Sequence, residues 1–263
     1  MFLAGVIPGL MAGTMLMFTI YLIAKVKNLP KGEWMGWGEV FSSGRDAGWG
    51  LFLIVIILGG IYGGIFTPTE AAAVAAVYAF LISCFVYRDM GPKDVRNTLF
   101  EAGKLTVTLM FIIANALILK HVLTDEQIPQ QIAGSMLAAG FGPVIFLMIV
   151  NVILLIGGQF MEPSGLIVIV APLVFPIAIE LGIDPIHLGI IMVVNMEIGM
   201  ITPPVGLNLF VTSGVAGMPM MRVVRAALPF LAVLFVFLII VTYVPSISTF
   251  LPNTFMGPEI IVK

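Results

Sequence analysis

Stretches of apolar residues with few or no charges recur along the whole chain. Only 10% of the 263 residues are charged and 60% are hydrophobic, whereas a water-soluble domain carries about 25% charged residues. A helix needs about 20 apolar residues to cross a bilayer. The sequence therefore predicts an all-α, multi-pass membrane protein surrounded by lipid. The apolar windows are Phe2–Ala24, Trp49–Phe66, Ala71–Tyr87, Leu105–Leu119, Leu137–Met161, Pro163–Ile179, Ile186–Ile201, Pro204–Met218 and Ala226–Val244.

The rare reactive and charged residues argue against several classes of function. The net charge of −2 gives no basic patch, so nucleic acid is not expected as a partner. Cys84 is the only cysteine, and His121 and His187 lie far apart, which disfavours a disulfide and a metal site. Without a nucleophile–base set or a phosphate-binding loop, we expect no enzyme and no nucleotide site. An intramembrane enzyme using Glu162 or Glu197 is the least favoured alternative, since each carboxylate lacks a partner base.

Lysine and arginine concentrate in three connecting segments, at residues 25–45, 88–104 and 222–225, which predicts that these segments are cytoplasmic. The connecting segments 121–136 and 180–185 carry acidic residues without lysine or arginine, so we expect them outside. The residues from Lys93 to Lys104 suggest an amphipathic surface helix, with a solvated loop as the alternative.

These loop positions determine how often the chain crosses the membrane. If residues 137–180 form a re-entrant hairpin and residues 186–218 one broken helix, residues 49–244 cross five times. An odd number of crossings is what an inverted repeat requires. We therefore expect residues 1–48 to hold the last helix of a preceding repeat and a basic linker. Residues 49–244 would be the second repeat, and residues 245–263 a tail.

The segment from Gly157 to Gly165 interrupts the apolar region 137–179 near its centre. Its glycines and Pro163 favour a tight turn. A hairpin tip at this place would offer carbonyl oxygens from its first arm, which suit sodium, and amides from its second arm, which suit a carboxylate. The alternative is two full spans joined by a short loop, with Glu162 in water.

A second interruption runs from Asn195 to Asn208. Pro203 and Pro204 have no amide hydrogen, so the carbonyls of Gly199 and Met200 lose their helical partners. Such a discontinuous helix marks the binding site of many secondary transporters. The alternative is a proline kink that only shapes packing.

Four further polar residues are candidates for a functional or a structural role. Glu197, inside an apolar window, is a candidate for a sodium site or a proton relay, with a structural hydrogen bond to the broken helix as the alternative. Glu70 is expected to close a capping box with Thr67. His187 is expected at the membrane interface, and Asn115 in a helix–helix hydrogen bond.

Two long motifs carry a family resemblance. They are Gly59-Gly60-Ile61-Tyr62-Gly63-Gly64-Ile65-Phe66-Thr67-Pro68-Thr69-Glu70-Ala71-Ala72-Ala73 and the segment Asn195–Phe210, preceded by Gly182-Ile183-Asp184-Pro185. In them, and over essentially all residues, the chain resembles the large membrane subunit of tripartite ATP-independent periplasmic (TRAP) transporters. The resemblance implies an elevator-type transporter of the bacterial inner membrane with two inverted repeats. It also implies sodium-driven symport of organic acids, a periplasmic substrate-binding protein and a small membrane subunit.

The resemblance also implies where ligands bind, with sodium as the coupling ion and no other cofactor or metal. The expected sodium-binding residues are Gly158, Met161, Glu162, Asn195, Gly199, Met200, Thr202 and Pro203. The expected substrate-binding residues, which would hold a carboxylate, are Ser164, Gly165, Thr202, Pro204 and Asn208.

The chain departs from the family pattern in two respects. The family subunit is longer and has a complete first repeat, so we expect this chain to be its carboxyl-terminal part and to need that missing repeat. A fragment, a split gene and an inactive remnant all remain open, and alone the chain is not expected to transport. The family often has aspartate before the hairpin proline, where this chain has Glu162. A non-transporting scaffold subunit is the alternative function.

Overall fold

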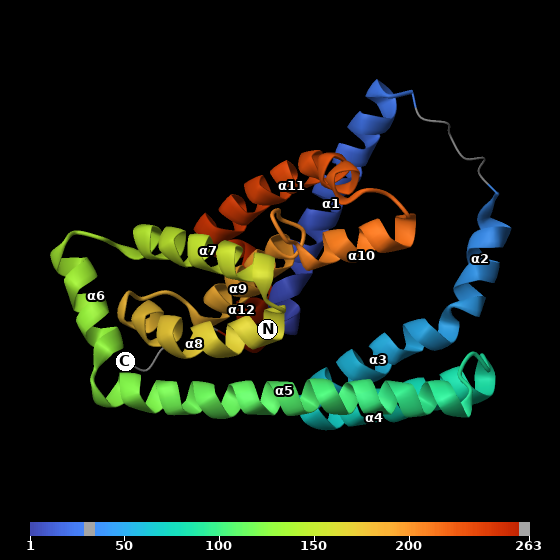
Figure 1. Cartoon of the computed structure of the whole chain (residues 1–263), viewed down its shortest axis with the longest axis horizontal. Coiled ribbons are helices and arrows are strands. Elements are labelled where there is room, and N and C mark those ends of the chain that lie inside the picture. Colours follow the sequence, from blue (N-terminus) through green and yellow to red (C-terminus); the bar gives the residue numbers. More distant parts are fainter. Residues whose placement is uncertain (29–34, 258–263) are drawn as a thin grey trace. The chain divides into compact units, whose positions relative to one another are not determined.

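The computed structural model describes residues 1–28 and 35–257, and these residues form helices and turns without any strand (Figure 1). The predicted all-α class is confirmed. Within these residues, six helices are long and apolar enough to cross a membrane, or seven if one bent helix pair is a single span. The helices are α1 (Phe2–Val26), α2 (Trp37–Asp46), α3 (Gly48–Tyr62), α4 (Pro68–Leu81), the π-helical turn η1 (Ile82–Val86), α5 (Pro92–Asp125), α6 (Ile128–Ala138), α7 (Pro143–Phe160), α8 (Pro163–Glu180), α9 (Pro185–Gly199), α10 (Leu207–Ala216), α11 (Met220–Tyr243) and α12 (Ser246–Met256).

The helices form two compact units. One unit comprises Met1–Leu29 with Thr108–Lys263, and the other comprises Pro30–Val107. These two units are groups of helices in contact, and they do not reveal which segments are related by repeat symmetry. The repeat boundaries expected at residues 48 and 244 therefore stay a prediction.

The smaller unit, residues 30–107, is built on the antiparallel packing of α3 and α4. The bent pair is α2 and α3, which meet at an angle of 64°. Thr67 and Glu70 form the predicted capping box at the start of α4: the Thr67 amide donates to the Glu70 carboxylate at 2.8 Å, and the Glu70 amide donates to the Thr67 hydroxyl at 3.4 Å. The Tyr78 hydroxyl, on α4, donates to the carbonyl of Trp49 at 2.9 Å. These bonds fix the turn between the two helices.

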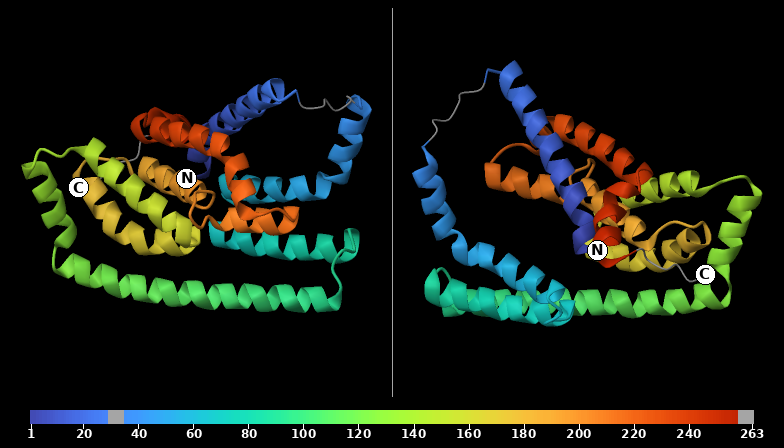
Figure 2. Two further views of the ribbon diagram at one scale, coloured as in Figure 1. Left: turned by 45° about the horizontal axis from the view of Figure 1, so that its top comes forward. Right: turned by 180° about the vertical axis from the view of Figure 1, so that it is seen from behind.

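The larger unit holds the hydrophobic core. Leu154, Ile191, Met196 and Val241 are fully buried there, on α7, α9 and α11. Helix α9 contacts α1, α7, α8, α11 and α12, and Figure 2 shows it enclosed by these helices. A short apolar helix can be enclosed in this way because its neighbours, rather than lipid, cover most of its surface.

Several helix boundaries differ from those expected. Residues 93–104 form neither a separate surface helix nor a loop, since α5 runs without interruption from Pro92 to Asp125. The first arm of the hairpin begins at Pro143 rather than at residue 137, because Gly140 adopts a positive φ of 77° and ends the preceding helix. The tail contains α12, although its last six residues lie outside the described part, as does Lys31 of the first basic loop.

Candidate functional site

The predicted hairpin tip is a two-residue connection. Helix α7 ends at Phe160 and α8 begins at Pro163, so only Met161 and Glu162 join them. The Glu162 carboxylate caps α8, where it accepts hydrogen bonds from the Ser164 hydroxyl and from the Gly165 amide, the latter at 3.3 Å. The helix start that we expected to hold a substrate carboxylate therefore already holds a carboxylate of the chain itself.

The predicted break in the second segment is present. Helix α9 ends at Gly199 and α10 begins at Leu207, and residues 200–206 between them are not helical. Prolines 203 and 204 cannot donate to the carbonyls one turn earlier, as the sequence indicated. Gly206, with a φ of 57°, ends the break in a conformation that suits glycine.

The carbonyls near the break are not unpaired as expected. The Gly199 carbonyl accepts a hydrogen bond from the Thr202 amide at 3.0 Å, and the Met200 carbonyl accepts one from the Asn208 amide at 3.1 Å. The Thr202 hydroxyl donates to the Ile198 carbonyl at 2.7 Å. The chain thus replaces the helical partners that proline removed. The carbonyl oxygens of Gly199 and Met200 and the Thr202 hydroxyl each keep a lone pair, so each can still accept from or coordinate another group.

The hairpin tip and the break meet. The Gly206 amide donates to the carbonyl of Gln159, in the last turn of α7, at 3.2 Å. Gly158 and Gly199 touch through their backbones, so that a Cβ atom on Gly199 would lie 2.8 Å from the Cα of Gly158. A side chain on Gly199 would therefore require the backbone to shift, and one on Gly158 would make a tight contact of 3.2 Å with the Cα of Gly199. Two segments about forty residues apart, which the sequence singled out separately, form one structural site.

Asn195 lies in a buried polar network instead of facing the break. It is fully buried, and its side-chain amide donates to the Asn151 carbonyl oxygen on α7. Asn151 donates in turn to the Thr242 hydroxyl on α11 at 2.9 Å. The Asn195 Oδ1 atom has no hydrogen-bond partner among the described residues. This oxygen is the feature of Asn195 that fits its predicted role as a ligand.

His187 is buried among helices, and its expected place at the membrane interface stays a prediction. The side chain is 2% exposed; its Nδ1 atom lies 2.7 Å from the Ser248 hydroxyl and its Nε2 atom 3.1 Å from the Thr242 carbonyl.

The sequence analysis missed Asn151, although a single amide in the apolar stretch 143–156 was a usable signal. Ser248 and Thr242 carried no such signal, because their burial depends on how α11 and α12 pack against α9.

Two other readings are corrected by the structure. The Asn115 side chain donates to the Phe111 carbonyl of its own helix at 2.7 Å rather than to another helix. Glu197 accepts no hydrogen bond from any described residue, so it makes no structural bond to the broken helix. It is exposed and lines a cavity together with Asn208. Asn208 thus contributes its backbone amide to the break and its side chain to the cavity wall.

The remaining predicted ligands are spread around the meeting point. Met161 is 37% exposed, Ser164 is half-buried and Gly165 is buried. Pro203 and Pro204 lie in the break, joined by a cis peptide bond. Groups of three or more histidine, cysteine or acidic side chains suited to a metal ion are not found in the described part of the chain.

Comparison with known proteins identifies the family. Residues 1–247 match the sequence model described as "Tripartite ATP-independent periplasmic transporter, DctM component". The C4-dicarboxylate TRAP transporter large permease protein DctM of Vibrio cholerae is 68% identical over all of this chain and 62% of its own length. Its namesake from Pseudomonas aeruginosa is 62% identical over 96% of this chain and 59% of its own length. The sialic acid TRAP transporter large permease protein SiaM of Vibrio cholerae is 36% identical over 98% of this chain and 60% of its own length.

The chain therefore spans about 60% of the length of these relatives. Which portion of them it corresponds to stays a prediction. The three relatives are named as permeases, so the family consists of transport proteins rather than enzymes. With its apolar helices and the match to residues 1–247, this multi-pass membrane chain belongs to the DctM family of TRAP transporter large permeases.

Proposed function

We propose that this chain is part of a sodium-coupled secondary transporter that imports organic acids across the bacterial inner membrane. One observation carries the proposal: a helix break and a hairpin tip meet at Gly158 and Gly199. Broken helices place main-chain groups outside regular helical hydrogen bonding within a membrane protein, where they bind ions and anionic substrates. The elevator mechanism and the re-entrant form of the hairpin belong to this proposal.

The sodium ligands would come mainly from the break. Main-chain carbonyls of an unwound helix coordinate sodium in other secondary transporters. The carbonyl oxygens of Gly199 and Met200 and the Thr202 hydroxyl each have a lone pair that no described group uses. The Oδ1 atom of Asn195, one turn before Gly199 in the chain, is buried and has no hydrogen-bond partner among the described residues, which supports its predicted role as a sodium ligand.

The substrate carboxylate would bind at the start of α8. The amides of a first helical turn favour an anion there, and Glu162 already accepts hydrogen bonds from Ser164 and Gly165. A substrate carboxylate would have to replace Glu162 in these bonds, because two carboxylates at one helix start repel each other. We favour a C4-dicarboxylate as the substrate, because the relatives at 68% and 62% identity are named for it.

The proposed assembly includes partners that the chain alone does not supply. They are the rest of the longer permease, a small membrane subunit and a periplasmic binding protein that delivers the acid. Without the other repeat, a site shared between two repeats would be incomplete, so the isolated chain is expected not to transport.

Reconstitution tests this function directly. The chain is placed in liposomes together with the rest of the permease and the small subunit, binding protein is added outside, and uptake of radiolabelled succinate is measured. We expect uptake only with an inward sodium gradient, and none from the chain alone. Uptake that proceeds equally in potassium would contradict sodium coupling. A complete assembly without uptake of any organic acid would favour the scaffold alternative.

A further inference from the structure

A chain of buried polar side chains joins helices α7, α9 and α11. The Asn195 side chain on α9 is fully buried, and its amide nitrogen donates to the Oδ1 atom of Asn151 on α7. The Asn151 amide nitrogen donates in turn to the hydroxyl of Thr242 on α11, at 2.9 Å. The direction of these bonds determines which end of the Asn195 amide is left over. It is the oxygen, which has no partner in the part of the chain that the structure describes.

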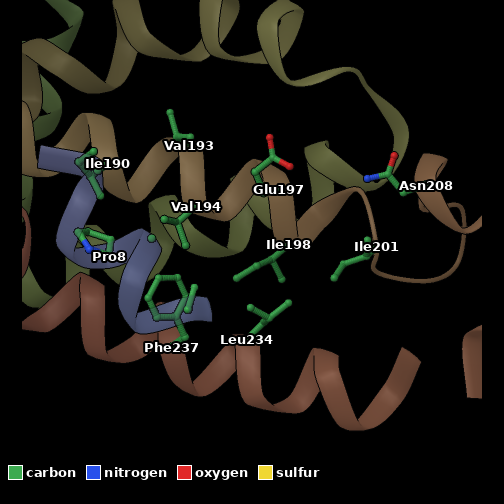
Figure 3. Close-up of a pocket in the computed structure, with 13 residues that line it drawn as sticks. Pro8, Ile190, Val193, Val194, Glu197, Ile198, Ile201, Asn208, Leu234 and Phe237 are labelled. Carbon is green, nitrogen blue, oxygen red and sulfur yellow. The ribbon is translucent and has the colours of Figure 1, made fainter. Parts of the chain in front are cut away.

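This leftover oxygen of Asn195 is a buried acceptor. Such an atom destabilises a protein unless another group binds to it. The neighbouring cavity does not solvate it: Glu197 and Asn208 line that cavity in Figure 3, but Asn195 is not among the lining residues. Amide oxygens are ligands that hard cations take from proteins, so a cation can supply the missing interaction.

The same three side chains allow a second arrangement of hydrogen bonds. The end of an asparagine side chain can turn over and exchange its oxygen for its nitrogen. If both amides turned, Asn151 would accept from the Thr242 hydroxyl and donate to the Asn195 oxygen. The Asn195 oxygen would then be occupied, and the NH₂ group left in its place cannot coordinate a cation. Because a hydroxyl both donates and accepts, Thr242 fits either arrangement.

We propose that Asn151 is a positioning residue for sodium: it accepts from the Asn195 amide nitrogen and thereby keeps the Asn195 oxygen available to the ion. Asn151 acts through Asn195, since its own oxygen and nitrogen are both used within the network. The inference rests on the proposed function, in which Asn195 is a sodium ligand, and adds to it a residue on another helix. A bound sodium ion selects the observed orientation of both amides.

A double-mutant cycle tests this role by sodium binding, without transport. The complete permease is purified in lipid nanodiscs, and its midpoint of thermal unfolding is followed as sodium chloride replaces choline chloride at constant ionic strength, because a bound ion stabilises the folded state. Asn151→Leu should raise the sodium concentration for half-maximal stabilisation about fivefold, the factor that one hydrogen bond commonly contributes. In the Asn195→Asp background both ends of the side chain are oxygens, so orientation no longer matters. There, Asn151→Leu should not raise this concentration.

The outcomes separate the positioning role from the proposed function. If sodium stabilises the unsubstituted permease but Asn151→Leu has no effect, or has the same effect in both backgrounds, the positioning role is overturned and a buried water is the better partner for Asn195. If sodium does not stabilise the unsubstituted permease, the sodium site itself is overturned.

A milder substitution repeats the test if Asn151→Leu does not fold. Thr242→Val keeps the shape of threonine but removes the hydroxyl that orients Asn151. We expect it to raise the half-maximal sodium concentration about threefold. Thr242→Ser, which restores a hydroxyl, should restore the sodium response. Equal sodium responses of the two variants would contradict the proposed orientation.

Discussion

Proline interrupts the helices before α4 and before α10, and the two interruptions restore backbone hydrogen bonding differently. Between α3 and α4, the amides of Gly64, Ile65 and Phe66 donate to carbonyls at most six residues away, and Thr67 and Glu70 satisfy each other. Between α9 and α10, the Gly206 amide donates to Gln159, on a different helix. The first break is closed by its own residues alone, whereas the second also uses a bond to the hairpin tip.

This difference separates a structural turn from a candidate binding site. When a break's own residues make its hydrogen bonds, few main-chain groups are left for a ligand. Such a break can form from its local sequence alone. A break closed by a distant segment changes when that segment moves, so ligand binding at one can affect the other. The following substitutions test this distinction, beginning with the largest expected effect.

Gly199→Ala should have the largest effect. Its Cβ atom would lie 2.8 Å from a backbone atom of Gly158, so the hairpin tip and the break must separate. We expect loss of sodium-driven uptake and a destabilisation near the upper end of the ~1–3 kcal/mol typical of overpacking. Uptake in the reconstituted assembly and thermal unfolding measure the two effects. Gly214→Ala on α10, where an added Cβ meets nothing within 4 Å, is the control. Normal uptake by Gly199→Ala would show that the contact is not required.

Asn151→Leu should have the next largest effect. It leaves the buried amide of Asn195 and the hydroxyl of Thr242 without their partner, and an unsatisfied buried polar group costs about 1–3 kcal/mol. We expect a lower midpoint of thermal unfolding. Asn115→Leu, which removes a bond within one exposed helix, should change stability by no more than about 0.5 kcal/mol. Equal effects of the two substitutions would contradict the importance of the buried network.

Thr202→Val should act on sodium dependence more than on stability. Thr202 and Thr212 each donate a hydroxyl to the carbonyl four residues earlier, both at 2.7 Å, but only Thr202 lies in the break. Removal of one ligand oxygen should raise the sodium concentration for half-maximal uptake about tenfold, which corresponds to ~1.4 kcal/mol. Thr212→Val should leave it unchanged. If both variants respond alike to sodium, the Thr202 hydroxyl is not a ligand.

Thr67→Ala should have the smallest effect. Loss of a helix cap costs about 1 kcal/mol, and this break closes within its own residues. We expect a small decrease in thermal stability with unchanged uptake and unchanged sodium dependence. Thr69→Ala, one residue into the same helix, controls for the local change of side chain. A transport defect in Thr67→Ala alone would remove the distinction between the two breaks.

The sequence predicted features that depend on local chemistry. The capping box needed only Thr67, Glu70 and their spacing, and the break needed only the missing amides of Pro203 and Pro204. The apolar windows gave the helical class for the same reason, since each helix satisfies its own backbone.

Features that depend on packing were not predicted. The new partners of the Gly199 and Met200 carbonyls arise from the path of the chain between α9 and α10. The burial of His187 and Ser248 arises from the position of α12, which the sequence presented as a tail. Local patterns indicate where a helix stops, but not which distant group takes up the hydrogen bonds that become available.

The glycine contact between α7 and α9 has a mechanical consequence. Neither Gly158 nor Gly199 has a side chain, so no change of rotamer can absorb a shift of one segment against the other. A displacement of the hairpin tip therefore either opens the contact or carries the end of α9 along with it. If the contact stays closed during the transport cycle that we propose, these two pieces travel as one rigid body, and the flexible joints have to lie farther along the chain.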